Sequence, residues 1–372
     1  MRQELINLQL DSLFGIAESA RGIPLLGIGW MALPWAVLSV YWIWRCGAGE
    51  DPRTERKALG IQFVIGLVAL VAVSLLTRGG APGPVIPVFG YGFLVFLGCV
   101  AAGMLAVRHA RRAEIPEQLV WDLAIWLFFA GVVGARGWYV VQYRQRLFAG
   151  KTGLLEQLRA CVDITSGGLV LYGGVVLSLL ALVVFARRHR HECPPLKLLD
   201  LIIPSFFLAL AFGRIGCLMN GCCWGDACEL PWAIQFPHDS VPFNSLAARG
   251  FIHPDAPATF GVHPSQIYSS FNGLILCLVT SSILRHSLRP GQALAVALVA
   301  YPLTRFLLEI LRADEMTQFG TGLTISQCFS LVVLCVGIGF SIWLFRQPAP
   351  PSAPSVGASI TPRTDRNSTP PP

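Results

Sequence analysis

The chain has 372 residues, of which 54% are hydrophobic and 13% are charged, and its mean hydropathy is +0.59. A composition this apolar excludes a soluble domain of this length. The formal net charge of +7 comes mostly from basic turns between apolar segments, so it does not indicate a nucleic-acid partner.

Nine stretches are long and apolar enough to cross a bilayer as helices, which takes about 20 mostly apolar residues. They cover roughly 23–44, 58–77, 88–106, 120–142, 167–186, 198–218, 267–285, 291–311 and 323–345. The weak alternating segments that are typical of membrane strands are absent from the sequence. We therefore predict an all-α fold, a polytopic helical membrane protein with about nine transmembrane helices.

The segments outside these spans carry three further expectations. Glu4 and Asp11 precede the first span without a basic n-region or a cleavage site, so we expect no removable signal peptide. Residues 219–266 form a large loop that we expect to fold back onto the membrane surface. The stretch 347–372 is rich in Pro, Ser and Thr and should be a disordered cytoplasmic tail.

Basic residues predict the orientation. The turns after spans one, three, five and seven, with the tail, carry sixteen Lys and Arg residues, against nine on the other side. The clusters RHARR at 108–112 and RRHRHE at 187–192 both belong to the richer side. The positive-inside rule places that side in the cytoplasm, and it places the N-terminus and the 219–266 loop outside.

Three arginines and one glutamate lie inside the predicted spans near their outer ends, where such charges are costly and rare. They are Arg136, Arg214, Arg305 and Glu309, and each lies within roughly 10 Å of the outer end of its span. Arg305 and Glu309 stand four residues apart, so they share a helix face and can pair. Because guanidinium groups match phosphate oxygens, this clustering favours a site for an anionic lipid headgroup.

Simpler interpretations of these features stay open. Arginines close to a helix end can snorkel to the interface without a further role, and the Arg305–Glu309 pair can be purely structural. Glycines at 131, 134 and 137 are typical of close helix packing, whereas Gly173 and Gly174 also allow a ligand to approach the backbone.

Four of the eleven cysteines crowd together near the start of the 219–266 loop. They are Cys217, Cys222, Cys223 and Cys228. Disulfides, a metal site completed by His238, His253 or His263, and buried unreactive thiols are all compatible with this spacing.

Six motifs in fixed order carry a family resemblance. They are FGYGF at 89–93, GARGWYVVQY at 134–143, SGGLVLYGG at 166–174, GRIGCLMNGCCWG at 213–225, HPSQIY at 263–268 and YPLTRFLLEILR at 301–312. Together they resemble the prolipoprotein diacylglyceryl transferase family over about residues 84–345. The domains implied are an extra two-helix region at 1–83, a transferase domain at 84–346 and the tail.

The resemblance implies an enzyme of the bacterial cytoplasmic (inner) membrane with its active site at the outer leaflet. It would transfer the diacylglyceryl group of phosphatidylglycerol to the lipobox cysteine of a prolipoprotein signal peptide, forming a thioether and releasing glycerol phosphate. This is the first step of lipoprotein maturation, and we expect it to need no metal or organic cofactor.

The resemblance also implies residue roles, with the arginines holding the phosphate and stabilising its charge. The expected catalytic residues are Tyr91, Tyr172, Arg214, Arg305 and Glu309, and the expected substrate-binding residues are Arg136, Gly173, Gly174, Asn220, His263 and Gln266.

The sequence departs from the family pattern at the expected base. Tyr172 stands where many members have a histidine, and a neutral tyrosine is a poor base near pH 7. Cys217 and Cys222 likewise stand where many members have asparagine and glutamate. Glu309, His263 or a tyrosine activated by Arg214 remain open as the group that deprotonates the thiol.

Two rival functions remain. A catalytically lapsed paralogue would bind lipid or precursor without turnover, and Tyr172 is compatible with that reading. A transporter of anionic lipid or solute would use the same arginines, but transporters usually show two similar halves and midplane sites, and this sequence shows neither.

Overall fold

The computed structural model describes residues 4–9, 16–18, 24–31, 68, 85–150, 153–163, 168–286, 289–312 and 322–347. Within these ranges, seven helices are long and apolar enough to cross a membrane. They are α3 (Gly90–Arg112), α4 (Glu117–Gln142), α7 (Leu171–Arg188), α8 (Pro195–Asn220), α10 (Ser265–His286), α11 (Gln292–Ile310) and α12 (Ile325–Arg346). They match the last seven predicted spans and confirm a multi-pass helical membrane protein.

The first two predicted spans are not confirmed. Where the span at 23–44 was expected to begin, Pro24–Gly27 form strand β3 and Ile28–Met31 form a short 3-10 helix, η1. Proline and glycine disfavour an α-helix interior, which fits this local structure. The rest of that span, the span at 58–77 apart from Val68, and the tail beyond residue 347 lie outside the described residues.

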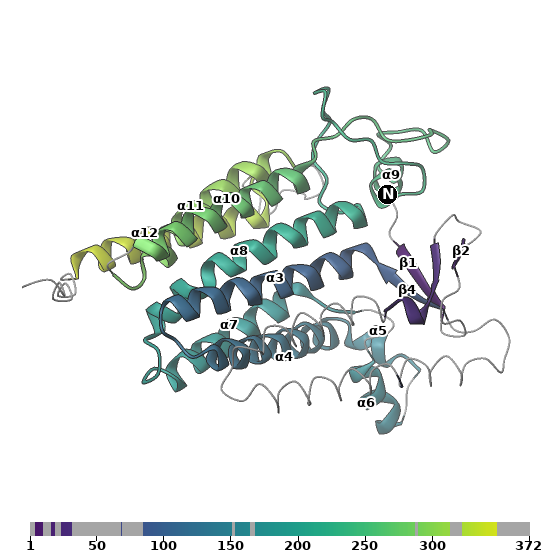
Figure 1. Cartoon of the computed structure of the whole chain (residues 1–372). Helices are drawn as coiled ribbons and strands as arrows, with labels where there is room; N and C mark the ends of the chain where they lie inside the picture. Colours follow the sequence, from purple (N-terminus) through teal and green to yellow (C-terminus); the bar gives the residue numbers. More distant parts are fainter. Residues whose placement is uncertain are drawn as a thin grey trace, which may run out of the picture.

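A small sheet accompanies the helices. Its strands are β1 (Glu4–Gln9), β2 (Ile16–Glu18), β3 and β4 (Val85–Phe89), in the order β2-β3-β1-β4. β1 pairs parallel with β3 and antiparallel with β4, while β2 pairs antiparallel with β3. Because β4 runs directly into α3, the sheet lies beside the beginning of that helix (Figure 1).

The long helices run up and down, so their ends gather at two faces of the bundle. Short turns join α3 to α4, α7 to α8 and α10 to α11 at one face (Figure 1). At the other face, which we call the loop face, α4 ends at Gln142, α8 at Asn220 and α11 at Ile310. Three short helices, α5 (Arg144–Phe148), α6 (Leu154–Val162) and α9 (Val241–Ala248), lie at that end as well.

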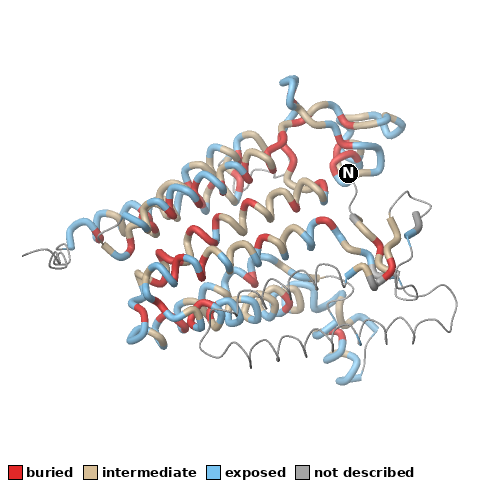
Figure 2. Tube along the Cα trace, in the orientation of Figure 1, coloured by how far each residue is buried: buried red, intermediate tan, exposed pale blue. Residues whose placement is uncertain are grey.

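Helix packing leaves much of the apolar surface facing outward. The closest neighbours are α3 with α8, α4 with α7, α8 with α10 and α11 with α12. Only 17% to 39% of the most apolar window of each long helix is buried inside the protein. Figure 2 shows the exposed positions along the outer sides of the helices. This exterior needs lipid as its solvent, because contiguous apolar surface of such extent is not stable in water.

A polar cap joins α8 to α11 inside the bundle. The Asp200 carboxylate on α8 is buried and accepts hydrogen bonds from the backbone N–H groups of Gly291 and Leu294, the latter at 2.8 Å. The first N–H groups of a helix have no partner within the helix, so this carboxylate satisfies them from a neighbouring element. The cap fixes α11, which carries Arg305 and Glu309, relative to α8, which carries Arg214.

Candidate active site at the loop face

Arg214 lies near the end of α8, two turns before the loop that follows it, and its side chain is partly buried. Among the residues that the structure describes, none forms a hydrogen bond or an ion pair with it. A guanidinium offers five N–H donors, and in a partly buried position unused donors favour an anionic ligand.

Tyr91 lies in the first turn of α3, next to this part of α8. Its ring packs against Gly216: a Cβ at Gly216 would stand 3.1 Å from Cδ2 of Tyr91. Tyr91 is within electrostatic range of Arg214, Cys217, Cys222 and Cys223. Tyr91 is 46% exposed, so the residue is only partly covered by its neighbours.

Arg305, Glu309 and Arg312 form a second charged group at the end of α11, the arginine–glutamate triad. Arg305 pairs with Oε2 of Glu309, as the spacing predicted, and Nη1 of Arg312 lies 3.2 Å from the same oxygen. The Thr324 hydroxyl, at the start of α12, donates to Oε1 of Glu309 at 3.3 Å. The Glu309 side chain is fully buried. Two arginines share its one carboxylate, and the triad therefore has a net positive charge.

Main-chain contacts bring the two charged groups to one corner of the loop face. The segment after α8 pairs with the segment before α10, since the Gly225 N–H donates to the His263 oxygen at 3.0 Å. The same segment pairs with the end of α11, where the Asp226 N–H donates to the Leu311 oxygen at 2.9 Å. The motifs at 213–225, 263–268 and 301–312, separate in sequence, therefore meet in space.

Arg136 on α4 has a different environment. It is buried, and it donates to the main-chain oxygens of Ala160 (2.7 Å), Cys161 (2.9 Å) and Gly168 (2.9 Å). Two of these oxygens belong to the last turn of α6, where helix carbonyls lack intrahelical partners and cations are stabilised. Arg136 thus holds α6 and the segment before α7 against α4, and a role in substrate binding stays a prediction.

The glycine pair at the start of α7 packs against α4. A Cβ at Gly173 would lie 2.3 Å from the Gly134 oxygen, and a Cβ at Gly174 would lie 3.0 Å from the Gly131 oxygen. This is the close helix packing that the glycine spacing indicated. The neighbouring Tyr172 is 62% exposed. Ligand binding by Gly173 and Gly174, and catalysis by Tyr172, stay predictions.

The HPSQIY motif anchors the turn that follows α8. Gln266 is fully buried and donates from Nε2 to the Cys222 oxygen at 2.8 Å, and Ser265 donates from its hydroxyl to the Cys223 oxygen. His263 contributes mainly through its backbone, while its Nδ1 lies 3.4 Å from the Tyr268 hydroxyl. Asn220, the last residue of α8, is exposed at the loop face.

Sequence reasoning missed Arg312 and Thr324 as parts of this site. Arg312 stands three residues after Glu309, a spacing that also places two side chains on one helix face and that therefore carried a signal. Thr324 begins the capping box of α12, which is recognisable in the sequence, but its contact with Glu309 depends on how α11 and α12 pack.

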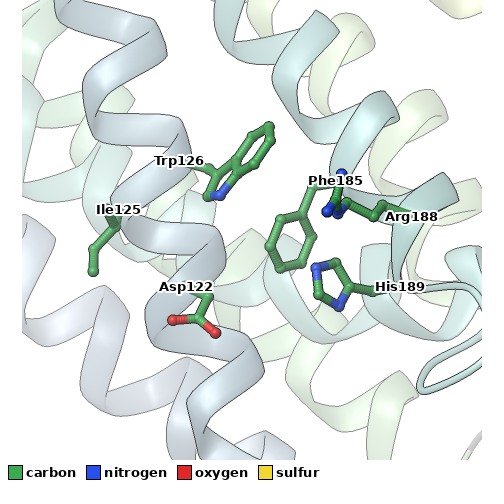
Figure 3. A pocket seen from close by; sticks show the side chains of 6 residues that line it. All are labelled: Asp122, Ile125, Trp126, Phe185, Arg188 and His189. Atoms are coloured by element: carbon green, nitrogen blue, oxygen red, sulfur yellow. The ribbon is translucent and has the colours of Figure 1, made fainter.

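A separate pocket of about 400 Å³ lies at the opposite face, between α4 and α7. Figure 3 shows its lining, which includes Asp122, Trp126, Phe185 and His189. The His189 ring stacks on Phe185, with ring centroids 4.3 Å apart, and Nδ1 of His189 lies 2.9 Å from the Glu192 carboxylate. None of the predicted site residues lines this pocket.

A family model described as prolipoprotein diacylglyceryl transferase matches residues 83–343. A phosphatidylglycerol–prolipoprotein diacylglyceryl transferase of Rhodopirellula baltica is 30% identical over 88% of this chain and 87% of its own length. Proteins of the same name from Gloeobacter violaceus and Clostridium tetani are 31% and 27% identical, over 74% and 70% of this chain and 97% and 95% of theirs. With the family model covering well over half of its length, the chain belongs to the prolipoprotein diacylglyceryl transferase family.

Proposed function

We propose that this protein transfers the diacylglyceryl group of phosphatidylglycerol to the lipobox cysteine of a prolipoprotein. The sulfur forms a thioether with the terminal glyceryl carbon, the bond from that carbon to the phosphate oxygen breaks, and glycerol phosphate leaves. The observation that carries the proposal is Arg214, a partly buried guanidinium whose donors have no partner among the described residues.

Arg214 is suited to hold the phosphodiester of the lipid. Negative charge grows on the phosphate as the leaving group departs, and preorganised donors that meet this charge lower the barrier. The hydroxyl of the neighbouring Tyr91 would add a further hydrogen bond to the phosphate. The net positive triad of Arg305, Glu309 and Arg312 lies at the same corner and adds a favourable field.

Glu309 is poorly placed to deprotonate the thiol. Its Oε2 faces both Arg305 and Arg312, and its Oε1 accepts from Thr324. A thiol would have to displace one of these partners to reach a carboxylate oxygen. We therefore assign Glu309 to positioning the two arginines rather than to proton transfer.

We further propose that the loop face lies outside the bacterial inner membrane. The last turns of α3, α7, α10 and α12, all at the opposite face, carry basic residues, as the cytoplasmic side of a membrane protein does. Lipid and the signal peptide of the precursor would then enter the site from the outer leaflet, beside the exposed ends of α3 and α7.

The test uses purified protein, phosphatidylglycerol vesicles and a peptide with a lipobox cysteine. We expect a thioether-linked diacylglyceryl peptide by mass spectrometry and an equal amount of released glycerol phosphate. Folded protein that binds both substrates and forms no product would sink the proposal and favour a lapsed paralogue. Complementation of a strain depleted of its own transferase separates the same two outcomes in cells.

A further inference from the structure

Three thiols meet beside Arg214. The sulfur atoms of Cys217, Cys222 and Cys223 all lie within 4.8 Å of one another, and all three residues are partly buried. We call this group the cysteine cluster. Cys217 comes from the last turn of α8, and the other two follow the cap of that helix.

The backbone of the turn is shaped to gather these sulfurs. Gly221 and Cys223 have left-handed φ values of 75° and 61°. The second is uncommon for a residue with a side chain. Gln266 and Ser265 hold the turn from the start of α10 by donating to the carbonyls of these two cysteines. The cluster is thus fixed from two helices.

The donor set fits a thiophilic metal. Zinc is bound by thiolates at about 2.3 Å in tetrahedral geometry, which places ligand sulfurs about 3.8 Å apart. Sulfurs that already lie within 4.8 Å need to approach by at most about 1 Å. Cys228 lies outside the cluster, and its sulfur accepts from the Leu230 N–H at 3.4 Å. Three protein ligands leave one position open, as in catalytic zinc sites.

We propose that Cys217, Cys222 and Cys223 bind one Zn²⁺, whose open position binds the thiol of the incoming prolipoprotein cysteine. This inference rests on the proposed transferase function. It supplies a means of generating a thiolate at neutral pH, because a thiol that coordinates zinc gives up its proton. Three thiolates and Zn²⁺ sum to one negative charge, which the nearby Arg214 offsets before lipid binds.

The precursor thiol loses its proton to water as its sulfur joins the metal. The sulfur electron pair then forms the bond to the glyceryl carbon, the carbon–oxygen bond to phosphate breaks, and glycerol phosphate departs with that electron pair. The thioether product is a weaker ligand than a thiolate and leaves the metal. The fully buried Oε1 of Gln266, which lacks a partner in the described part of the chain, is a further polar atom beside this turn.

Metal analysis of the full-length protein, purified in detergent under reducing conditions, tests the site without reference to activity. We expect about one zinc per chain. Replacement by Co²⁺ should produce the intense near-ultraviolet absorption of cobalt–thiolate bonds, and addition of a lipobox peptide should shift the visible bands as a fourth sulfur binds. Cys217→Ser, Cys222→Ser and Cys223→Ser should each lose at least tenfold in metal affinity. The matched control Cys228→Ser should retain it.

Three results would overturn the site. They are a wild-type chain that neither contains zinc nor takes up Co²⁺, a disulfide between two of the three cysteines in the active protein, and Ser variants that bind metal as the wild type does. If wild-type protein without metal makes thioether at full rate, the proposed role of zinc in the reaction fails and the transferase stands. If the wild-type protein with bound zinc binds the peptide sulfur and makes no thioether, the proposed transferase function fails and the metal site stands.

Discussion

Arg136 donates from Nη2 to the main-chain oxygen of Ala160 at 2.7 Å, and so an intramembrane arginine closes the end of a short helix 24 residues further along the chain. The same guanidinium also donates to the carbonyl oxygens of Cys161 and Gly168. The ring of Tyr139 lies below it, with the Arg136 Cζ 5.1 Å from the ring centroid. The intramembrane arginine on α4 thus stabilises the fold, whereas Arg214 on α8 has no hydrogen-bond partner among the described residues.

Arg136→Lys should destabilise the protein more than it slows the reaction. A lysine ammonium lacks the planar fork of donors with which the guanidinium contacts three carbonyl oxygens. Each buried carbonyl left without a hydrogen bond costs about 1–3 kcal/mol. We expect a clear fall in the melting temperature of the detergent-solubilised protein, with the KM for phosphatidylglycerol little changed in the folded fraction. Arg144→Lys, at an exposed position of α5, is the control and should melt like wild type. Normal melting with a strongly raised KM would instead make Arg136 a substrate ligand.

Arg214→Ala should show the opposite pattern. Because no described residue loses a hydrogen bond, the melting temperature should stay close to that of wild type. Loss of a donor that meets charge in the transition state typically lowers kcat about 10²- to 10³-fold. Arg214→Lys should recover only part of the rate, since it restores the charge without the planar fork. The thioether assay measures both variants.

The exposed Arg249 offers a matched control for this arginine. It lies on the same side of the protein, in the 219–266 loop, where its guanidinium packs on Phe251. Arg249→Ala should transfer lipid at nearly the wild-type rate. Turnover of Arg214→Ala within a fewfold of wild type would remove Arg214 from the catalytic residues.

The sequence predicted some contacts because they are local. Arg305 and Glu309 are one turn apart, so their pairing follows from helix geometry alone, and Arg312 obeys the same rule. The contacts of Arg136 are not local: its partners are 24 to 32 residues away and depend on how α6 folds back. The cysteine spacing had no clear meaning either, because the turn that carries these residues includes a left-handed φ at Cys223, which the spacing does not indicate.

Hydropathy likewise predicted part of the fold. It located all seven long helices, since a membrane span is a property of about 20 consecutive residues. It did not indicate the sheet, in which β1 pairs with β4 across some 80 residues of sequence. Strands of three to six residues with partners this distant carry too little local pattern to be recognised.

Glu309→Gln should destabilise the protein strongly. It leaves the largely buried side chains of Arg305 and Arg312 facing an amide, and removing one partner of a buried ion pair typically costs 3–5 kcal/mol. A second change tests whether the triad acts as a unit: Arg312→Gln should cost less stability in the Glu309→Gln background than in wild type. Additive effects in thermal unfolding would contradict the shared-carboxylate geometry. The exposed Glu229→Gln is the control and should leave stability unchanged.

Gly173→Ala should weaken the contact between α4 and α7. The added methyl group would stand 2.3 Å from both the Gly134 oxygen and the Trp138 Cβ, so the two helix backbones would have to separate. Helix association in a membrane depends on this close approach, since lipid supplies little hydrophobic drive between helices. We expect a lower melting temperature and, because Arg136 on α4 would move away from Gly168, a loosened α6.

Gly137→Ala, also on α4, is the matched control, because a Cβ there meets nothing within 4 Å. It should fold and melt like wild type. The two glycine variants also separate packing from ligand access at the start of α7. If Gly173→Ala melts normally but binds phosphatidylglycerol vesicles at least tenfold more weakly, the glycine serves the approach of lipid to the backbone. If Gly173→Ala has a lowered melting temperature and its folded fraction binds lipid normally, the glycine serves the helix contact. This is the outcome that we expect, because a Cβ at Gly173 would lie 2.3 Å from the Gly134 oxygen.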